Sequence, residues 1–267
     1  MRLLRGDGPL IRVGHRGAAS LAPENTLAAF ETAVAAGVDA IEFDVLDLVG
    51  GPLVLAHSND LYEVSHGAAA GTVRDRTLAE LRELAPELPT LDEALAYFAE
   101  RPGLAVHVDL KLAERLDELA LALGRHGLVE RTVVSSFHRE SLGAVARAAP
   151  DVRIGFTYPE DRRGISRRRI LHPAIRLGTV ALRAALARRV PAMLVRAGAN
   201  ALMLHHAVVS PDAVAAAHTC GAAVWTWTVD RPEELERMDA AGVDAVITND
   251  PRIFEAVATL APMRPTR

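Results

Sequence analysis

The chain is poor in several features that mark particular classes of protein. It has a single cysteine, Cys220, among 267 residues, so no disulfide can form within the chain. We expect this thiol to be buried as a small apolar group. No apolar stretch is long enough to span a membrane, and residues 1–10 lack the apolar core of a signal peptide. These absences favour a cytoplasmic protein.

An excess of positive charge is also missing. The formal net charge is −4, so the chain has no overall basic field, and we expect no nucleic-acid partner. Residues 159–190 are the local exception, because arginines are frequent there. Such a stretch is usually a solvated helix face. The alternative is peripheral contact with an anionic membrane surface.

Short β-like runs alternate with helical segments along the whole chain. The main runs cover residues 10–14, 39–46, 104–110, 131–135, 152–157, 200–204, 222–228 and 244–248, and a further run covers 52–57. The helical segments cover 24–36, 77–84, 90–100, 113–126, 138–148, 166–190, 211–219, 232–241 and 251–260. Repeated β-then-α units favour parallel strands joined by right-handed crossovers.

Eight such units predict an α/β fold of the (β/α)8 TIM barrel type, a single domain over residues 1–267. Active residues then lie at the carboxyl ends of the strands. An open, doubly wound sheet is the alternative, but Gly14-His15-Arg16-Gly17 places charge where a dinucleotide fingerprint needs glycine. Residues 58–90 are the least regular connection, and we expect a short lid-like excursion there.

Acidic side chains gather at the ends of two predicted strands. Glu42 and Asp44 share one strand face, and Asp109 and Lys111 repeat this spacing on the next main strand. Three carboxylates brought together repel one another unless a cation lies between them. Hard oxygen ligands suit one divalent cation, Mg²⁺ or Ca²⁺. The alternative is that Lys111 and Arg16 alone neutralise the acids in buried ion pairs.

Two histidines, His15 and His57, also lie at or directly after the ends of predicted strands. Imidazoles that flank a phosphate can act as general base and general acid, since their ordinary pKa lies near neutrality. A lone histidine is more often structural, but Arg16 and Lys111 beside this pair favour an anionic substrate. Arg16 offers a bidentate fork to phosphate oxygens, and Lys111 offers a point charge. Trp227, near the end of a late strand, is either barrel core or an apolar wall of the substrate pocket.

Motifs in a fixed order extend over almost the whole chain. They are His15-Arg16-Gly17, Pro23-Glu24-Asn25-Thr26, residues 37–45 with Glu42 and Asp44, residues 54–57, Asp109-Leu110-Lys111, residues 135–137, 224–229 and 242–251. On these motifs the chain resembles the glycerophosphodiester phosphodiesterases, which are (β/α)8-barrel enzymes.

The resemblance implies hydrolysis of a small-molecule glycerophosphodiester to glycerol 3-phosphate and an alcohol. It implies the same site: a divalent cation on Glu42, Asp44 and Asp109, catalysis by His15 and His57, and phosphate contacts from Arg16 and Lys111. The chain departs from the family where Asp109 replaces the more frequent Glu, where His57-Ser58 replaces His-Asp, and where residues 48–51 replace a Thr-Asp-Gly turn.

Other functions are compatible with the same barrel. One is a lysophospholipase D-like or lyase-type enzyme on lipid phosphodiesters, and another is a non-catalytic binding barrel. A third is an isomerase or aldolase with a Schiff base on Lys111, which the nearby carboxylates disfavour because they keep the amine charged. The attacking group is either water or a neighbouring hydroxyl of the substrate.

Overall fold

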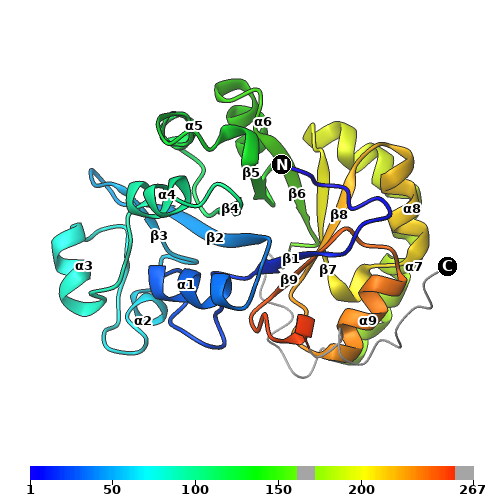
Figure 1. Ribbon diagram of the computed structural model, residues 1–267, viewed down its shortest axis with the longest axis horizontal. Helices are drawn as coiled ribbons and strands as arrows, with labels where there is room; N and C mark the ends of the chain where they lie inside the picture. The colour runs from blue at the N-terminus through cyan, green and yellow to red at the C-terminus, as the bar shows by residue number, and fades with distance from the viewer. Residues whose placement is uncertain (161–171, 256–267) are drawn as a thin grey trace.

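The computed structural model describes residues 1–160 and 172–255, and the side chains of residues 172–177 are outside the description. Its parallel strands are β1 (Ile11–Gly14), β2 (Ala40–Asp47), β4 (Ala105–Leu110), β5 (Thr132–Ser136), β6 (Arg153–Tyr158), β7 (Ala201–His205), β8 (Ala223–Trp227) and β9 (Ala245–Thr248). They pair in this order, and β1 pairs with both β2 and β9, so the sheet closes into a barrel (Figure 1). This confirms the predicted barrel and excludes the open sheet.

Helices surround the barrel (Figure 1). They are α1 (Leu27–Ala35), α4 (Leu91–Ala99), α5 (Leu116–Arg125), α6 (Arg139–Ala148), α7 (His172–Ala197), α8 (Pro211–Thr219) and α9 (Pro232–Ala240), with single 3-10 turns at η1 (Val129–Arg131) and η4 (His206–Val208). Helix α7 continues through Pro191, so the end predicted at residue 190 is wrong. Residues 166–171 and 256–260 of two predicted helices lie outside the described chain.

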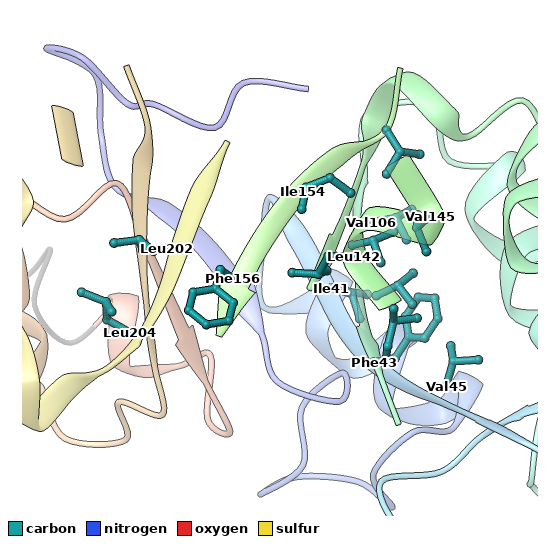
Figure 2. Packing of buried hydrophobic residues seen from close by; sticks show 14 of the residues in the cluster. Ile41, Phe43, Val45, Val106, Leu142, Val145, Ile154, Phe156, Leu202 and Leu204 are labelled. Atoms are coloured by element: carbon teal, nitrogen blue, oxygen red, sulfur yellow. The ribbon is translucent and has the colours of Figure 1, made fainter. Parts of the chain in front are cut away.

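Alternation along β2 determines which side chains enter the barrel. Ile41, Phe43 and Val45 are fully buried in the layer between the strands and the helices, with residues of α6, β6 and β7 (Figure 2). Because successive strand residues point to opposite faces, Glu42 and Asp44 point into the barrel. The apolar residues of β2 therefore fix the direction of both carboxylates.

The barrel interior is closed at its amino-terminal end. Val13, Met203 and Trp225 belong to an interior cluster that also includes Leu3. The indole Nε1 of Trp225 donates to the backbone oxygen of Leu3 at 3.1 Å, which holds the N-terminal segment against the barrel. Trp225 is fully buried, so it belongs to the core that fills this end of the barrel.

Residues 58–90 lie beside β2, beyond the antiparallel strand β3 (Leu53–Leu55). They contain two short helices, α2 (Leu61–Val64) and α3 (Leu78–Leu84), which lie on one side of the barrel (Figure 1). Leu61, Val73 and Leu81 are fully buried in a separate cluster with β3. Helix α2 is absent from the sequence-based prediction because four residues carry no helical periodicity.

Two predictions about the surface have different outcomes. Cys220 is exposed at the C-terminal cap of α8, so the prediction of a buried thiol is wrong. No helix in the described part of the chain is long and apolar enough to cross a membrane. Most of the arginines that suggested a membrane surface, including Arg162, Arg163 and Arg167–Arg169, lie outside the described residues. Membrane contact therefore stays a prediction.

Candidate active site

A cavity of about 960 Å³ opens at the carboxyl ends of the barrel strands. Every residue predicted for the site lines it: His15, Arg16, Glu42, Asp44, His57, Asp109, Lys111 and Trp227. The predicted charged residues come from the β1, β2, β3 and β4 side, whereas the aromatic rings of Phe137, His205 and Trp227 come from the β5, β7 and β8 side, where Glu160 also lines the cavity. The cavity thus has a charged half and a largely apolar half.

The loop between β1 and α1 is tied directly to the end of β2. Arg16 N donates to Glu42 Oε2 at 2.9 Å. Asn25 Nδ2 donates to Asp44 Oδ2 and Asn25 Oδ1 accepts from Asp44 N, both at 3.0 Å. A side chain at Gly17, where φ is +87°, would collide with the backbone of Ala29, so the loop requires glycine there. Asn25 therefore orients Asp44, a role that its position in the Pro-Glu-Asn-Thr motif did not reveal.

The three carboxylates predicted to hold a cation come together. Glu42, Asp44 and Asp109 are buried, and one oxygen of each lies within 4.8 Å of the others. Burial raises the pKa of Glu42 well above its ordinary value, and the charges of Asp44 and Asp109 raise it further. Burial and the two neighbouring acids therefore disfavour the ionised form of Glu42, and a divalent cation bound by hard oxygen ligands would offset both effects.

Two cations compensate part of this charge. Lys111 Nζ lies 3.0 Å from Asp44 Oδ1 and 2.5 Å from Asp109 Oδ2, and Arg16 Nε lies 3.1 Å from Asp44 Oδ2. Burial alone would raise the pKa of Asp44, but Lys111 and Arg16 outweigh burial and lower it. The alternative prediction of buried ion pairs is thus correct for Asp44, which both cations contact, and for Asp109, which Lys111 contacts. Among the described residues, no cationic side chain lies at contact distance from Glu42.

His15 is held by a residue that directly follows β9. Its Nδ1 lies 2.6 Å from Asn249 Oδ1, and Asn249 Nδ2 in turn donates to Asp230 at 2.7 Å. Since an amide oxygen only accepts, Nδ1 carries the proton and Nε2 has a free lone pair. Burial and then the charge of Arg16 lower the pKa of His15 to about 4, so the ring is neutral at pH 7. Its Nε2 lies 3.8 Å from Glu42 Oε2.

His57 has a carboxylate partner that the sequence reasoning missed. Its Nδ1 lies 2.6 Å from Glu63 Oε1, and Ser58 Oγ donates to Glu63 Oε2 at 2.6 Å. The hydrogen bond from His57 lowers the pKa of Glu63 to about 2, with Ser58 contributing in the same direction. Glu63 lies in α2, six positions after His57, and no spacing rule connects a strand end with a helix that short.

Asp109 is oriented by a chain of two hydrogen bonds. Ser135 Oγ donates to Asp109 Oδ1 at 2.5 Å, and His107 Nε2 lies 2.8 Å from Ser135 Oγ. His107 is buried beside Trp225, which it meets edge to face, and burial lowers its pKa to about 4. The neutral ring therefore donates from Nε2 to Ser135, and it supports the carboxylate from below.

The apolar half of the cavity is built around Trp227. Phe137 and His205 each meet its ring nearly edge to face, with ring centroids 6.2 Å and 5.1 Å away. Trp227 Nε1 donates to the backbone of Met203, so the ring is fixed. Thr157 Oγ1, buried in the same cavity, has no hydrogen-bond partner within the described residues. This half of the cavity thus holds the polar atoms of Thr157 and His205 beside the aromatic rings of Phe137 and Trp227.

Comparisons with known proteins identify relatives of this chain. A family model described as the glycerophosphoryl diester phosphodiesterase family matches residues 15–253. A glycerophosphodiester phosphodiesterase of Caldanaerobacter subterraneus subsp. tengcongensis is 31% identical over 257 residues, which are 90% of this chain and 93% of that protein.

Solved structures share the fold. A crystal structure from Silicibacter pomeroyi that bears the name of the same family matches with a TM-score of 0.75 and 27% identity, covering 97% of this chain and 96% of its own. An Oleispira antarctica phosphodiesterase, solved with its product sn-glycerol-3-phosphate, matches with a TM-score of 0.72 and 22% identity over 94% of this chain and 97% of its own.

Proposed function

The chain belongs to the glycerophosphoryl diester phosphodiesterase family, and on that premise we propose that it hydrolyses glycerophosphodiesters to glycerol 3-phosphate and an alcohol. The observation that carries the proposal is the meeting of two histidines, an arginine, a lysine and the carboxylate cluster in one cavity. This set can bind a phosphodiester, stabilise its extra charge and move the two protons that hydrolysis requires.

Binding of the anionic group is assigned to Arg16 and Lys111. Burial alone would lower the pKa of Lys111, but Asp109 and Asp44 outweigh it and raise the pKa above its ordinary value. Burial is likewise outweighed for Arg16 by Asp44 and Glu24. Both side chains therefore stay cationic, and they hold the non-bridging oxygens of the diester.

Glu42, Asp44 and Asp109 are the ligands we assign to one divalent cation, Mg²⁺ or Ca²⁺. When bound, the cation supplies Lewis-acid polarisation of the phosphoryl group and offsets negative charge in the transition state. Asn25, Ser135 and Arg16 N–H keep the carboxylate oxygens oriented through the hydrogen bonds described above. The chain thus prepares the ligand set with residues from the β1–α1 loop, β2, β4 and β5.

Proton transfer is assigned to His15 and His57. Both rings engage Nδ1 in a hydrogen bond of 2.6 Å, which leaves Nε2 of each ring for the reaction. One ring takes the proton of the attacking hydroxyl, and the other gives a proton to the oxygen that leaves. In-line displacement places the attacking and leaving oxygens on opposite sides of phosphorus, which is why two separate histidines are needed.

We place the glycerol part of the substrate in the apolar half of the cavity. Trp227 and Phe137 offer ring faces and edges to its carbon atoms. Thr157 Oγ1 and the ring of His205 offer hydrogen-bonding atoms to hydroxyl groups. His205 Nδ1 accepts from Ala207 N at 3.2 Å, so its neutral ring carries the proton on Nε2.

A panel of phosphodiesters tests the proposal. The purified protein is stripped with a chelator and assayed with Mg²⁺, Ca²⁺ or Mn²⁺ on glycerophosphocholine, glycerophosphoethanolamine, a lysophospholipid and a cyclic phosphodiester. We expect cation-dependent release of glycerol 3-phosphate from the first two substrates. Turnover of the lysophospholipid alone would instead favour the lipid-directed alternative, and no turnover with any cation would favour a non-catalytic barrel.

A further inference from the structure

We propose that Glu63 is a positioning residue for His57: it holds Nδ1 of the imidazole, so that Nε2 is presented to the substrate, and it supports the ring in its protonated form. The inference deepens the proposed phosphodiesterase function and rests on it. It gives a role to a carboxylate that is neither a predicted metal ligand nor one of the two groups assigned to proton transfer.

The contacts define the direction of the hydrogen bond. Glu63 Oε1 lies 2.6 Å from His57 Nδ1, and a carboxylate can only accept, so Nδ1 carries the proton. The other oxygen, Oε2, accepts from Ser58 Oγ at 2.6 Å. Both carboxylate oxygens thus have partners, and the imidazole is left with Nε2 as its reactive atom.

The position of Glu63 is fixed by the local fold. Leu61, two residues earlier, is fully buried. Asp60 caps α2 by accepting from Tyr62 N at 3.0 Å, and Asn59 Oδ1 accepts from Val73 N and Arg74 N at 3.0 and 2.7 Å. A residue held this firmly can impose an orientation on a neighbour, whereas a carboxylate on a loose loop cannot.

The charge of Glu63 is available over the working pH range. The hydrogen bond from His57 lowers its pKa to about 2, so it is an anion at neutral pH. Other charges near the pair include Asp44 on β2 and Arg16, whose Nη1 lies 3.7 Å from Glu63 Oε1 and 2.7 Å from Glu24 Oε1. Glu24, Glu87 and His66 also line the pocket that His57 and Glu63 share. Ser58 carries no charge, so the negative charge in contact with the imidazole comes from Glu63. An anion beside an imidazole stabilises the imidazolium form. A general acid has this form before it gives its proton, and a general base has it after it takes one.

A purely structural role is the competing interpretation, in which the pair only fastens α2 to the end of β3. The two roles differ in what each substitution removes. Glu63→Gln keeps an oxygen that can accept from Nδ1 but removes the charge, whereas Glu63→Ala removes both. A structural tie would show its effect in unfolding temperature, and a positioning role shows it in turnover and in its pH dependence.

The experiment compares wild type, Glu63→Gln, Glu63→Ala, Glu63→Asp and the control Glu83→Gln, an exposed carboxylate on α3. Each protein is assayed on glycerophosphocholine with saturating Mg²⁺ across pH 5–9. We expect kcat of Glu63→Gln to fall by about 10²-fold, with KM changed by less than about twofold. One limb of its pH profile should move to lower pH by about one unit.

Glu63→Ala should lose at least as much activity as Glu63→Gln, Glu63→Asp should recover part of it, and Glu83→Gln should match wild type. Imidazole nitrogen NMR gives a readout that needs no turnover: the Nδ1-protonated form of His57 should dominate in wild type and decline in Glu63→Ala. An active wild type with unchanged kcat and pH profile in Glu63→Gln would overturn the inference alone. An inactive wild type would instead overturn the proposed function on which the inference rests.

Discussion

Replacing Glu42 by Gln separates the stability of the fold from the requirements of the site. Among the carboxylates of the cluster, Glu42 has no cationic side chain at contact distance in the described chain. Two unit charges at the 4.8 Å limit of this cluster repel by about 3–4 kcal/mol at an effective dielectric constant of about 20. Arg16 and Lys111 compensate part of this repulsion. We therefore expect the cation-free Glu42→Gln protein to be roughly 2 kcal/mol more stable than cation-free wild type at pH 8.

The pH dependence gives this prediction a sign. The folded-state pKa of Glu42 is raised by burial and by its acidic neighbours. Its contribution to stability is therefore fully present below the unfolded pKa of about 4.3 and is lost as pH rises through the folded pKa. Asp44 acts in the opposite direction, because its folded pKa is lowered. Glu42→Gln should remove the part of the pH dependence that Glu42 causes, which is a loss of stability as pH rises above the unfolded pKa.

Thermal unfolding after chelation is the assay, repeated with Mg²⁺ or Ca²⁺ added back. A stabilisation of about 2 kcal/mol corresponds to an unfolding temperature about 4–8 °C higher. A cation at about 100 times its Kd adds roughly 2.7 kcal/mol to wild type, and Glu42→Gln should gain much less. Glu83→Gln serves as the exposed carboxylate control and should follow wild type. The reasoning is refuted if cation-free Glu42→Gln is less stable than wild type at pH 8 and still gains the full stabilisation from the cation.

Four further predictions follow from the same contacts. Lys111→Met should destabilise the cation-free protein by roughly 3 kcal/mol at pH 7, because two buried carboxylates lose their partner, and denaturant unfolding measures this. Asn249→Ala should leave KM nearly unchanged but lower kcat by roughly tenfold or more, since it frees the ring of His15; steady-state kinetics check both values. The folded-state pKa of Glu63 is lowered to about 2, so its contribution to stability should be intact above its unfolded pKa of about 4.3 and decline as pH falls toward 2. Acid unfolding of Glu63→Gln should lack this decline. Trp227→Ala should raise KM for glycerophosphodiesters by roughly 10-fold, through about 1–2 kcal/mol of lost apolar contact, and should leave the cation-induced rise in unfolding temperature unchanged.

The parts of the site that alternate along single strands could be predicted from the sequence. Ile41, Phe43 and Val45 require an apolar environment, and Glu42 and Asp44 between them can only point to the opposite face. The barrel could be predicted for a similar reason, because each βα unit has an apolar face that it must bury against neighbouring units. Local chemistry therefore determined both the fold and the direction of these carboxylates.

The partners of the two histidines could not be predicted in the same way. Asn249 meets His15 only because β9 closes the barrel against β1, across 234 positions of sequence. Glu63 meets His57 because a four-residue helix docks beside β3, and its position depends on buried contacts rather than on any periodic pattern. The prediction for Cys220 failed for a related reason. Cys220 lies at the end of α8, where the path of the following loop determines how exposed a side chain is.

Cleavage of glycerophosphodiesters by this barrel should require both its histidine pair and its acidic cluster. The most direct test measures glycerol 3-phosphate and choline released from glycerophosphocholine by wild type and by folded His15→Ala and His57→Ala variants, before and after chelation. We expect equal amounts of both products from wild type, loss of activity on chelation and recovery on adding the cation. For each histidine variant we expect kcat to fall by at least about 10²-fold. Wild-type rates that persist in the folded histidine variants, or no release with any divalent cation, would contradict it.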